Sequence, residues 1–246
     1  QAGSAGGVHH GDILTPVLLG SGGGSSNTTN GGTGGGAVNI TVSGDLANEG
    51  TISANGGAGE GTSGVEVGGG GSGGSVKLVI TGTLSGSGDF EVNGGDGGDN
   101  SYDGGGGGGG ELSILYGITA IGVAVEGQVA ALGGSGNDVG TAGDAGSAII
   151  KDTTTGDVYF LEGDAYISHA YSPSLCSSGT CAFTNDLSIS SGASLKFEYN
   201  AGYANDTSIT VANDLTANGS LLFGHDVSNG YNYTLAVTND ATIGAS

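Results

Sequence analysis

Two glycine-rich stretches of the chain carry aspartates at a spacing that suits calcium. Gly94–Asp99 and Gly133–Asp138 fit the front half of the nonapeptide G-G-x-G-x-D-x-U-x, whose tandem copies bind Ca²⁺ in parallel β-rolls. Carboxylates and turn carbonyls are the hard oxygen ligands that this ion prefers. The U position is not apolar in either stretch, and neither stretch is tandem. Calcium is therefore one interpretation and a chance match among 58 glycines is the other; the candidate ligands are Asp96, Asp99 and Asp138.

Catalytic residue types are scarce. Polysaccharide lyases use an Arg or Lys to take a proton or to stabilise the developing enolate, and this chain has no Arg. Lys77 and Lys196 alternate with apolar residues, which predicts outward positions on strands. His9 and His10 have no nearby Cys or carboxylate cluster to complete a metal site. Paired-carboxylate glycosidase chemistry stays open, but turns account for the aspartates as well, so we expect no enzyme and no cofactor apart from calcium.

Cysteines and sequons point to an exported protein. Cys176 and Cys181 frame a Ser-Ser-Gly-Thr turn, and their closeness favours a disulfide and an oxidising compartment over two free thiols. Asn-X-Ser/Thr sequons mark acceptor sites for N-glycosylation. The sequons lie at Asn27, Asn39, Asn205, Asn218 and Asn232.

The charge balance excludes some partners. Acidic residues number 24 against 3 basic ones, a net charge of −21. Such a chain is repelled by nucleic acid and by anionic membrane surfaces. The longest apolar runs are far shorter than the ~18 residues of a membrane helix, so no membrane insertion is expected. The start at Gln1, without a leader sequence or an initiator Met, indicates a mature protein or a fragment.

Repeats organise most of the chain. Strand-like stretches open at Ala37, Ser75 and Glu111, a spacing of 36–38 residues, and glycine tracts close these units. In the first unit Val38, Ile40 and Val42 alternate with polar residues, as in a half-buried strand. A fixed period of strand-like units is the signature of repeat architectures. We therefore predict a glycine-rich solenoid over 37–148, after an entry segment over 1–36.

The second half of the chain has a different pattern. Residues 149–161 predict a β-hairpin with its turn at 154–157, and the Cys loop follows, so that 149–181 separates two repeat regions. Over 182–246 the pairs Asn185-Asp186, Asn213-Asp214 and Asn239-Asp240 recur after 28 and 26 residues. Asn and Asp favour turns because their side chains bond nearby backbone groups. This region is predicted to be a second, shorter-period solenoid segment.

Glycine tracts need a separate explanation, because ordering glycine costs the most entropy. Polyglycine-II-like helices use bare backbones that pack side by side, and collagen shows why only Gly fits such an axis. Interchain N–H···O and Cα–H···O bonds supply the cohesion. The fold class we expect is all-β, a parallel β-helix or solenoid with polyglycine-II-like tracts; the competing interpretation of the tracts is irregular loops.

A family resemblance rests on two phrases, Ser53–Gly57 and Gly73–Leu84. They resemble the glycine-rich repeats of large prokaryotic cell-surface and adhesin-like proteins with parallel β-helix architecture. The resemblance covers roughly residues 30–148 and, more loosely, 182–246. It implies an extracellular structural or adhesive role and transfers no site residue.

Two functions follow as expectations. The first is a self-assembling filament or surface-appendage subunit, because the unfinished last repeat leaves a strand edge that pairs with other chains. Head-to-tail contacts of this kind build open filaments. The donor residues we expect for polymerisation are Ile13, Leu14, Val17, Leu18 and Leu19. The alternative is an adhesin or glycan-binding module of a larger cell-surface protein, with glycans or host receptors as its partners.

Overall fold

The computed structural model describes residues 12–61, 66–99, 104–117, 128–136, 140–167, 175–177, 180–197, 207–224 and 233–244. Strands make up 43% of the structure and helix 1%. The first nine strands are β1 (Ala37–Val42), β2 (Leu46–Ala47), β3 (Thr51–Ser53), β4 (Ser75–Ile80), β5 (Leu84–Ser85), β6 (Asp89–Glu91), β7 (Glu111–Tyr116), β8 (Val129–Ala130) and β9 (Ser147–Asp152).

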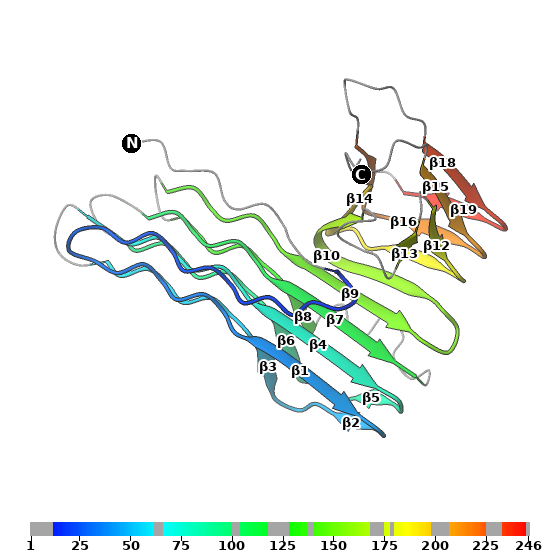
Figure 1. Ribbon diagram of the computed structural model, residues 1–246, viewed down its shortest axis with the longest axis horizontal. Coiled ribbons are helices and arrows are strands. Elements are labelled where there is room, and N and C mark those ends of the chain that lie inside the picture. Colours follow the sequence, from blue (N-terminus) through cyan, green and yellow to red (C-terminus); the bar gives the residue numbers. More distant parts are fainter. Residues whose placement is uncertain are drawn as a thin grey trace.

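The remaining strands belong mainly to the second half of the chain (Figure 1). They are β10 (Val158–Ile167), β11 (Cys176–Ser177), β12 (Thr180–Phe183), β13 (Leu187–Ile189), β14 (Ala193–Phe197), β15 (Thr207–Val211), β16 (Leu215–Ala217), β17 (Ser220–Phe223), β18 (Tyr233–Val237) and β19 (Ala241–Ile243).

A parallel β-helix is the wrong fold class for this chain. The strands form four separate sheets, none of them closed, and parallel and antiparallel pairs are mixed. Antiparallel pairing of β9 with β10 and of β11 with β12 reverses the chain between its two repeat regions. The physical reason is the predicted hairpin itself, which the structure confirms: its turn contains Gly156 at φ 91°, a conformation that L side chains rarely adopt.

In the first half, equivalent strands pair in parallel and place like side chains above one another. β1, β4, β7 and β9 follow each other in the largest sheet, with Ile40 opposite Leu78, Leu78 opposite Ile114 and Ile114 opposite Ile150. Their apolar residues bury one core. The strand that opens at Ser147 is therefore the first strand of a fourth copy of the repeat, whereas the sequence pattern ends the repeats at 148 and assigns the stretch from Ile149 to the hairpin.

The second half has its own core, which we call the C-terminal core. It is built by β10 and by the strands that follow it, and its largest fully buried side chains include Phe160, Phe183 and Phe197. The strand before each Asn-Asp pair stacks in one sheet, β12–β15–β18, and the strand after it stacks in another, β13–β16–β19. The repeat period stacks equivalent strands into two sheets, and the alternation of side chains directs the apolar residues of both sheets toward one shared interior.

Eight extended segments of the described chain form what we call the glycine bundle. They have neither helix nor strand hydrogen bonding within themselves, and they run side by side beyond one end of the strands (Figure 1). The segments are 20–24, 31–36, 54–60, 68–74, 92–98, 104–110, 131–136 and 140–146.

Backbone hydrogen bonds of the bundle rotate with a period of three residues. In the central segment 68–74, consecutive N–H groups donate to three different neighbouring segments and then repeat the order. Three residues per turn, with no internal hydrogen bonds, is the geometry of the polyproline II conformation. These are the contacts of packed segments and not of independent surface loops. The donors are Gly69 and Ser72 to 20–24, Gly70 and Gly73 to 104–110, and Gly71 and Gly74 to 54–60.

Backbone packing of this closeness excludes side chains. A Cβ atom on Gly71 would lie 2.1 Å from the carbonyl oxygen of Thr33, and one on Gly107 would lie 2.0 Å from that of Gly71. Both distances are far below van der Waals contact, and the obstructing atoms are backbone. Glycine is therefore required inside the bundle by contact with the neighbouring segments and not by its own dihedral angles.

Candidate assembly surfaces

The aspartates predicted to bind calcium do not come together in the described residues. The Asp96 carboxylate accepts hydrogen bonds from the Ser135 N–H at 2.7 Å and from its hydroxyl at 2.8 Å. These bonds, the hydroxyl bond first, lower the pKa of Asp96. Asp99 is exposed three residues further along the chain, and Asp138 falls outside the described residues. Within the part of the chain that the structure describes, no three His, Cys, Asp or Glu side chains are placed to hold a metal ion.

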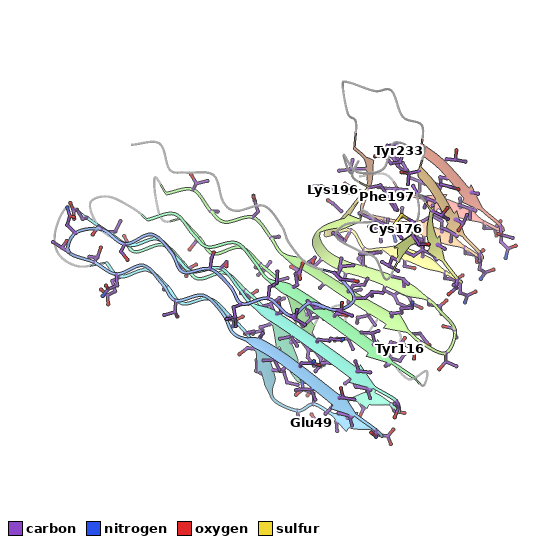
Figure 2. All side chains as sticks on the ribbon, viewed as in Figure 1. Glu49, Tyr116, Cys176, Lys196, Phe197 and Tyr233 are labelled. Atoms are coloured by element: carbon purple, nitrogen blue, oxygen red, sulfur yellow. A yellow bond between two sulfur atoms is a disulfide. The ribbon has the colours of Figure 1, made fainter. Side chains whose placement is uncertain are left out.

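The disulfide prediction is confirmed. Cys176 and Cys181 are bonded across the antiparallel pair β11–β12, and both are buried in the C-terminal core (Figure 2). Of the sequon asparagines, Asn27, Asn39 and Asn218 are exposed. Asn205, Asn232, His9 and His10 fall outside the described residues.

The apolar N-terminal segment is divided between the interior and the surface. Ile13 and Leu14 are 1% and 4% exposed, and they pack into the C-terminal core of their own chain. The Leu14 carbonyl also accepts a hydrogen bond from the buried Ser113 hydroxyl. These two residues therefore cannot act as a free donor strand, and the polymerisation set is corrected to its exposed members. Those are Val17, Leu18 and Leu19.

One end of the strand stack, which we call the head edge, consists of β1, β2 and β3. Each is the terminal strand of its sheet and pairs in parallel on one side only. The Gly36 carbonyl accepts the N–H of Ser75 at the start of β4, and the Val42 carbonyl accepts that of Thr81, directly after β4. Because alternate residues of a parallel strand bond to opposite sides, Ala37, Asn39 and Thr41 direct their N–H and C=O groups to the free side.

The opposite end, the tail edge, consists of β17, β18 and β19, again with one parallel partner each. Three large apolar side chains are exposed along it. Leu222, Phe223 and Ile243 are 46%, 40% and 72% exposed. The Phe223 ring stacks on Phe197 and contacts Tyr233, so the C-terminal core continues out to this edge (Figure 2).

An Asn-Asp ladder connects successive units of the second half. The Asp157 carboxylate accepts the Asp186 N–H at 3.1 Å, Asp186 accepts the Asp214 N–H at 3.1 Å, and Asp214 accepts the Asp240 N–H at 3.1 Å. The Asn side chain beside each Asp bonds to the preceding unit as well: Asn185 to Asp157, Asn213 to Asp186 and Asn239 to Asn213. The turns therefore join neighbouring units by side chain as well as by strand pairing.

The first half uses the same bond at two carboxylates. The Asp45 carboxylate accepts the Thr83 N–H at 2.7 Å, from the equivalent turn of the next unit, and Asp96 accepts the Ser135 N–H in the same way. Four turn carboxylates thus each receive an N–H from the unit that follows: Asp45, Asp157, Asp186 and Asp214. The Asp240 carboxylate, at the tail edge, accepts no hydrogen bond from any described residue.

The sequence pattern predicted the turns but not the ladder. The 28- and 26-residue spacing of the Asn-Asp pairs was the available signal. It indicated a turn because Asn and Asp usually bond their own backbone. Only the parallel stacking, with Leu187 opposite Leu215 and Leu215 opposite Ala241, brings each pair within reach of the next.

Known proteins offer no guide to these surfaces. Comparison with protein-family models, with curated proteins and with solved structures found no match to this chain. Among the described residues, no helix is both long and apolar enough to cross a membrane.

Proposed function

We propose that this is an extracellular structural protein that assembles head to tail, with the tail edge of one copy pairing with the head edge of the next. At each end, three parallel strands have a side with which no described strand pairs, and uncovered strand edges pair readily with other chains. A contact between two different surfaces of the same chain is heterologous, and it propagates into an open filament. A closed oligomer needs a rotation that returns to the first copy, whereas a filament does not.

The order of strands along the chain matches the two edges. The unit at the head runs β1, turn, β2 and β3; the last strands at the tail run β18, turn and β19, with β17 exposed behind them. In the proposed contact β18 pairs with β1, β19 with β2 and β17 with β3. The ladder then continues, with the Asp240 carboxylate of one copy accepting the Asp45 N–H of the next. Leu222, Phe223 and Ile243 lose their exposed surface in the same contact.

Charge sets the conditions for assembly. Each copy carries a net charge of −21, and this repulsion opposes association at low ionic strength. The Debye length falls from about 30 Å at 0.01 M salt to about 8 Å at 0.15 M. Filaments are therefore expected to lengthen as salt is raised, the opposite of an assembly held by ion pairs.

Two observations support an extracellular location. A disulfide persists only in an oxidising compartment for most proteins, and Cys176–Cys181 is formed in the structure. The described sequon asparagines Asn27, Asn39 and Asn218 are all exposed, as acceptor sites for glycans must be.

The observation that carries the proposal is the exposed Asp240 carboxylate at a parallel strand edge, where it accepts no hydrogen bond from any described residue. Its test is a matched pair of variants, Asp240→Ala and Asp214→Ala. Asp214 makes the same ladder bond inside one chain, so its loss lowers the melting temperature, whereas loss of the Asp240 carboxylate weakens only the contact between copies. Electron microscopy and sedimentation velocity at 0.15 M salt should show filaments for wild type and for Asp214→Ala, and shorter assemblies for Asp240→Ala.

A stronger block uses Ile243→Asp, which places a charge at an exposed position of β19. This variant is expected to sediment as a folded species without filaments. Wild-type protein that stays monomeric at high concentration and high salt would sink the proposal, and so would filaments that survive Ile243→Asp.

A further inference from the structure

One side of the glycine-bundle segment 104–110 is covered by no described residue, and we call this side the shelf. Each residue of 104–110 corresponds to the residue 36 positions earlier in segment 68–74, the same offset as between β4 and β7. Gly69 and Ser72 donate their N–H groups to the covering segment 20–24. The equivalent Gly105 and Gly108 have no N–H acceptor among the described residues, although every other donor in Gly104–Gly110 has one.

Steric contact does not explain why these two shelf residues are glycine. A Cβ atom on Gly105 would meet its nearest atom, the Thr141 carbonyl oxygen, at 3.4 Å, and one on Gly108 would meet the Asp144 carbonyl oxygen at 3.6 Å. At the other five glycines of the segment the nearest atom would lie at 2.0–2.2 Å. Neither residue has a positive φ. The chain's own packing thus admits side chains at 105 and 108. At the equivalent positions under the covering segment 20–24, a Cβ on Gly69 would lie 3.5 Å from the Gly24 nitrogen and the small Ser72 side chain bonds to Ser21, so a bulkier side chain is needed to block a covering backbone.

Beside the shelf stands a ridge formed by residues 17–24. It lies on segment 68–74, to which it is bonded through the Gly24 and Ser21 carbonyls, whereas no described segment lies at the equivalent position over 104–110. Its outer side carries Val17, Leu18 and Leu19, which are 61%, 45% and 73% exposed. The Leu19 and Gly22 carbonyls accept no hydrogen bond from the described residues, and their three-residue spacing equals that of Gly105 and Gly108.

We propose that a second copy of this chain docks here, with the ridge of each copy lying on the shelf of the other. A ridge one segment wide beside a shelf one segment wide is self-complementary under a two-fold axis, the geometry of isologous dimers. Gly105 and Gly108 donate to the partner's Leu19 and Gly22 carbonyls, and the apolar side chains of the ridge are covered. Antiparallel neighbours already occur in the bundle, since 20–24 runs against 68–74.

Charge favours a second copy at this face. Neither 17–24 nor 104–110 contains an ionisable side chain, in a chain whose net charge is −21. Acidic residues stand beside the shelf: Asp103 and Glu111 adjoin its two ends in sequence, and the Asp144 carbonyl bonds to Gly109. The two surfaces that meet carry no charge of their own, so like-charge repulsion acts there only from these flanking carboxylates. This contact is distinct from the head-to-tail contact, and it joins filaments side by side.

The test is made in the Ile243→Asp background, so that it does not depend on filament growth. The shelf variant Gly105→Val/Gly108→Val adds side chains that the single chain accommodates, and the matched control Ala58→Val enlarges an exposed residue elsewhere in the bundle. Sedimentation equilibrium should give a dimer for the background and for Ala58→Val. The shelf variant should keep its melting temperature and raise the dimer dissociation constant at least tenfold.

A second measurement tests the two-fold geometry. Oxidation of Leu19→Cys/Gly108→Cys should yield covalent dimers and nothing larger, because both bridges of an isologous contact close between the same two copies. A ladder of higher multimers would overturn the two-fold arrangement. A background protein that is monomeric at millimolar concentration would overturn the contact itself, as would amide protection of Gly105 and Gly108 in a monomer that vanishes when residues 1–11 are deleted.

Discussion

In the glycine bundle the buried contacts join backbones, whereas in the C-terminal core they join side chains. Figure 2 shows the difference directly: sticks crowd the strands around Phe197 and Cys176 and are sparse along the extended segments. Glycine gives up the hydrophobic burial that stabilises most interiors and carries the largest entropic cost of ordering. The bundle compensates with a hydrogen-bond acceptor for nearly every inward N–H. The C-terminal core should therefore be sensitive to loss of side-chain volume, and the glycine bundle to gain of side-chain volume.

The largest expected effect is loss of volume in the C-terminal core. Phe160 is 1% exposed and contacts Phe183 edge to face at 6.5 Å between ring centroids. Phe160→Ala should cost about 3–5 kcal/mol of unfolding free energy, since it combines lost burial with a cavity. Urea unfolding measures it. Gly69→Ala in the bundle, where a Cβ meets ordinary contacts at 3.4–3.5 Å, serves as the small-effect comparison.

Gain of volume should damage the bundle instead. Gly107→Val places a Cβ 2.0 Å from the Gly71 carbonyl oxygen, and overpacking of this kind costs about 3 kcal/mol, the upper end of the usual range. Its matched control is Gly108→Val, one residue along, which should change stability little. Equal melting temperatures for the two valine variants would contradict this account of the bundle, because only position 107 faces a neighbouring backbone at close range.

High pH should weaken the sheet core next to the bundle. Tyr116 is 2% exposed at the end of β7, and burial, followed by the Asp152 charge, raises its pKa from 10.0 to about 12. Between these values the unfolded chain releases the proton first, so stability falls as pH rises above 10, by about 2–3 kcal/mol once pH 12 is passed. Urea midpoints at pH 9 and 11 measure the loss, and Tyr116→Phe should reduce its pH dependence.

The smallest effect concerns the polar outer side of the bundle. Ser135 lowers the pKa of the exposed Asp96 carboxylate, so this contact stabilises the folded state above the unfolded pKa and is lost as pH falls through the lower folded value. Solvent screening limits it to about 0.5 kcal/mol. Asp96→Asn should therefore shift the melting temperature slightly at pH 7 and not at all at pH 2. A large shift at pH 7 would place the charge in a role that the hydrogen bonds do not explain.

Local signals predicted the strands of the repeats and the hairpin. Alternation at Val38, Ile40 and Val42 marks β1, and the turn at 154–157 separates β9 from β10. The same alternation could not reveal that Ser147 opens a fourth parallel strand, because a strand that pairs in parallel on one side and antiparallel on the other has the same sequence pattern as any buried strand.

The sequence also did not predict which part of the molecule the apolar N-terminal segment packs against. The apolar run at Ile13–Leu19 identified a segment that needs burial, and it did not say which core receives it. The structure places Ile13 and Leu14 in the C-terminal core of the same chain and leaves Val17, Leu18 and Leu19 exposed. Hydrophobic burial is non-directional, so composition alone predicts that a segment docks and not where.

By itself, the sequence determined where strands, turns and glycine tracts occur, because alternation, Asn-Asp pairs and missing side chains act locally. The tertiary structure alone decided which neighbours each element has. Every glycine offers the same N–H and C=O, so Gly105 and Gly69 are indistinguishable in sequence. Only the segment 20–24, brought from 45 or more residues away along the chain, covers one and leaves the other open. The three-dimensional register of neighbouring segments sets the direction of each backbone hydrogen bond. It therefore also sets which backbone groups remain available for assembly.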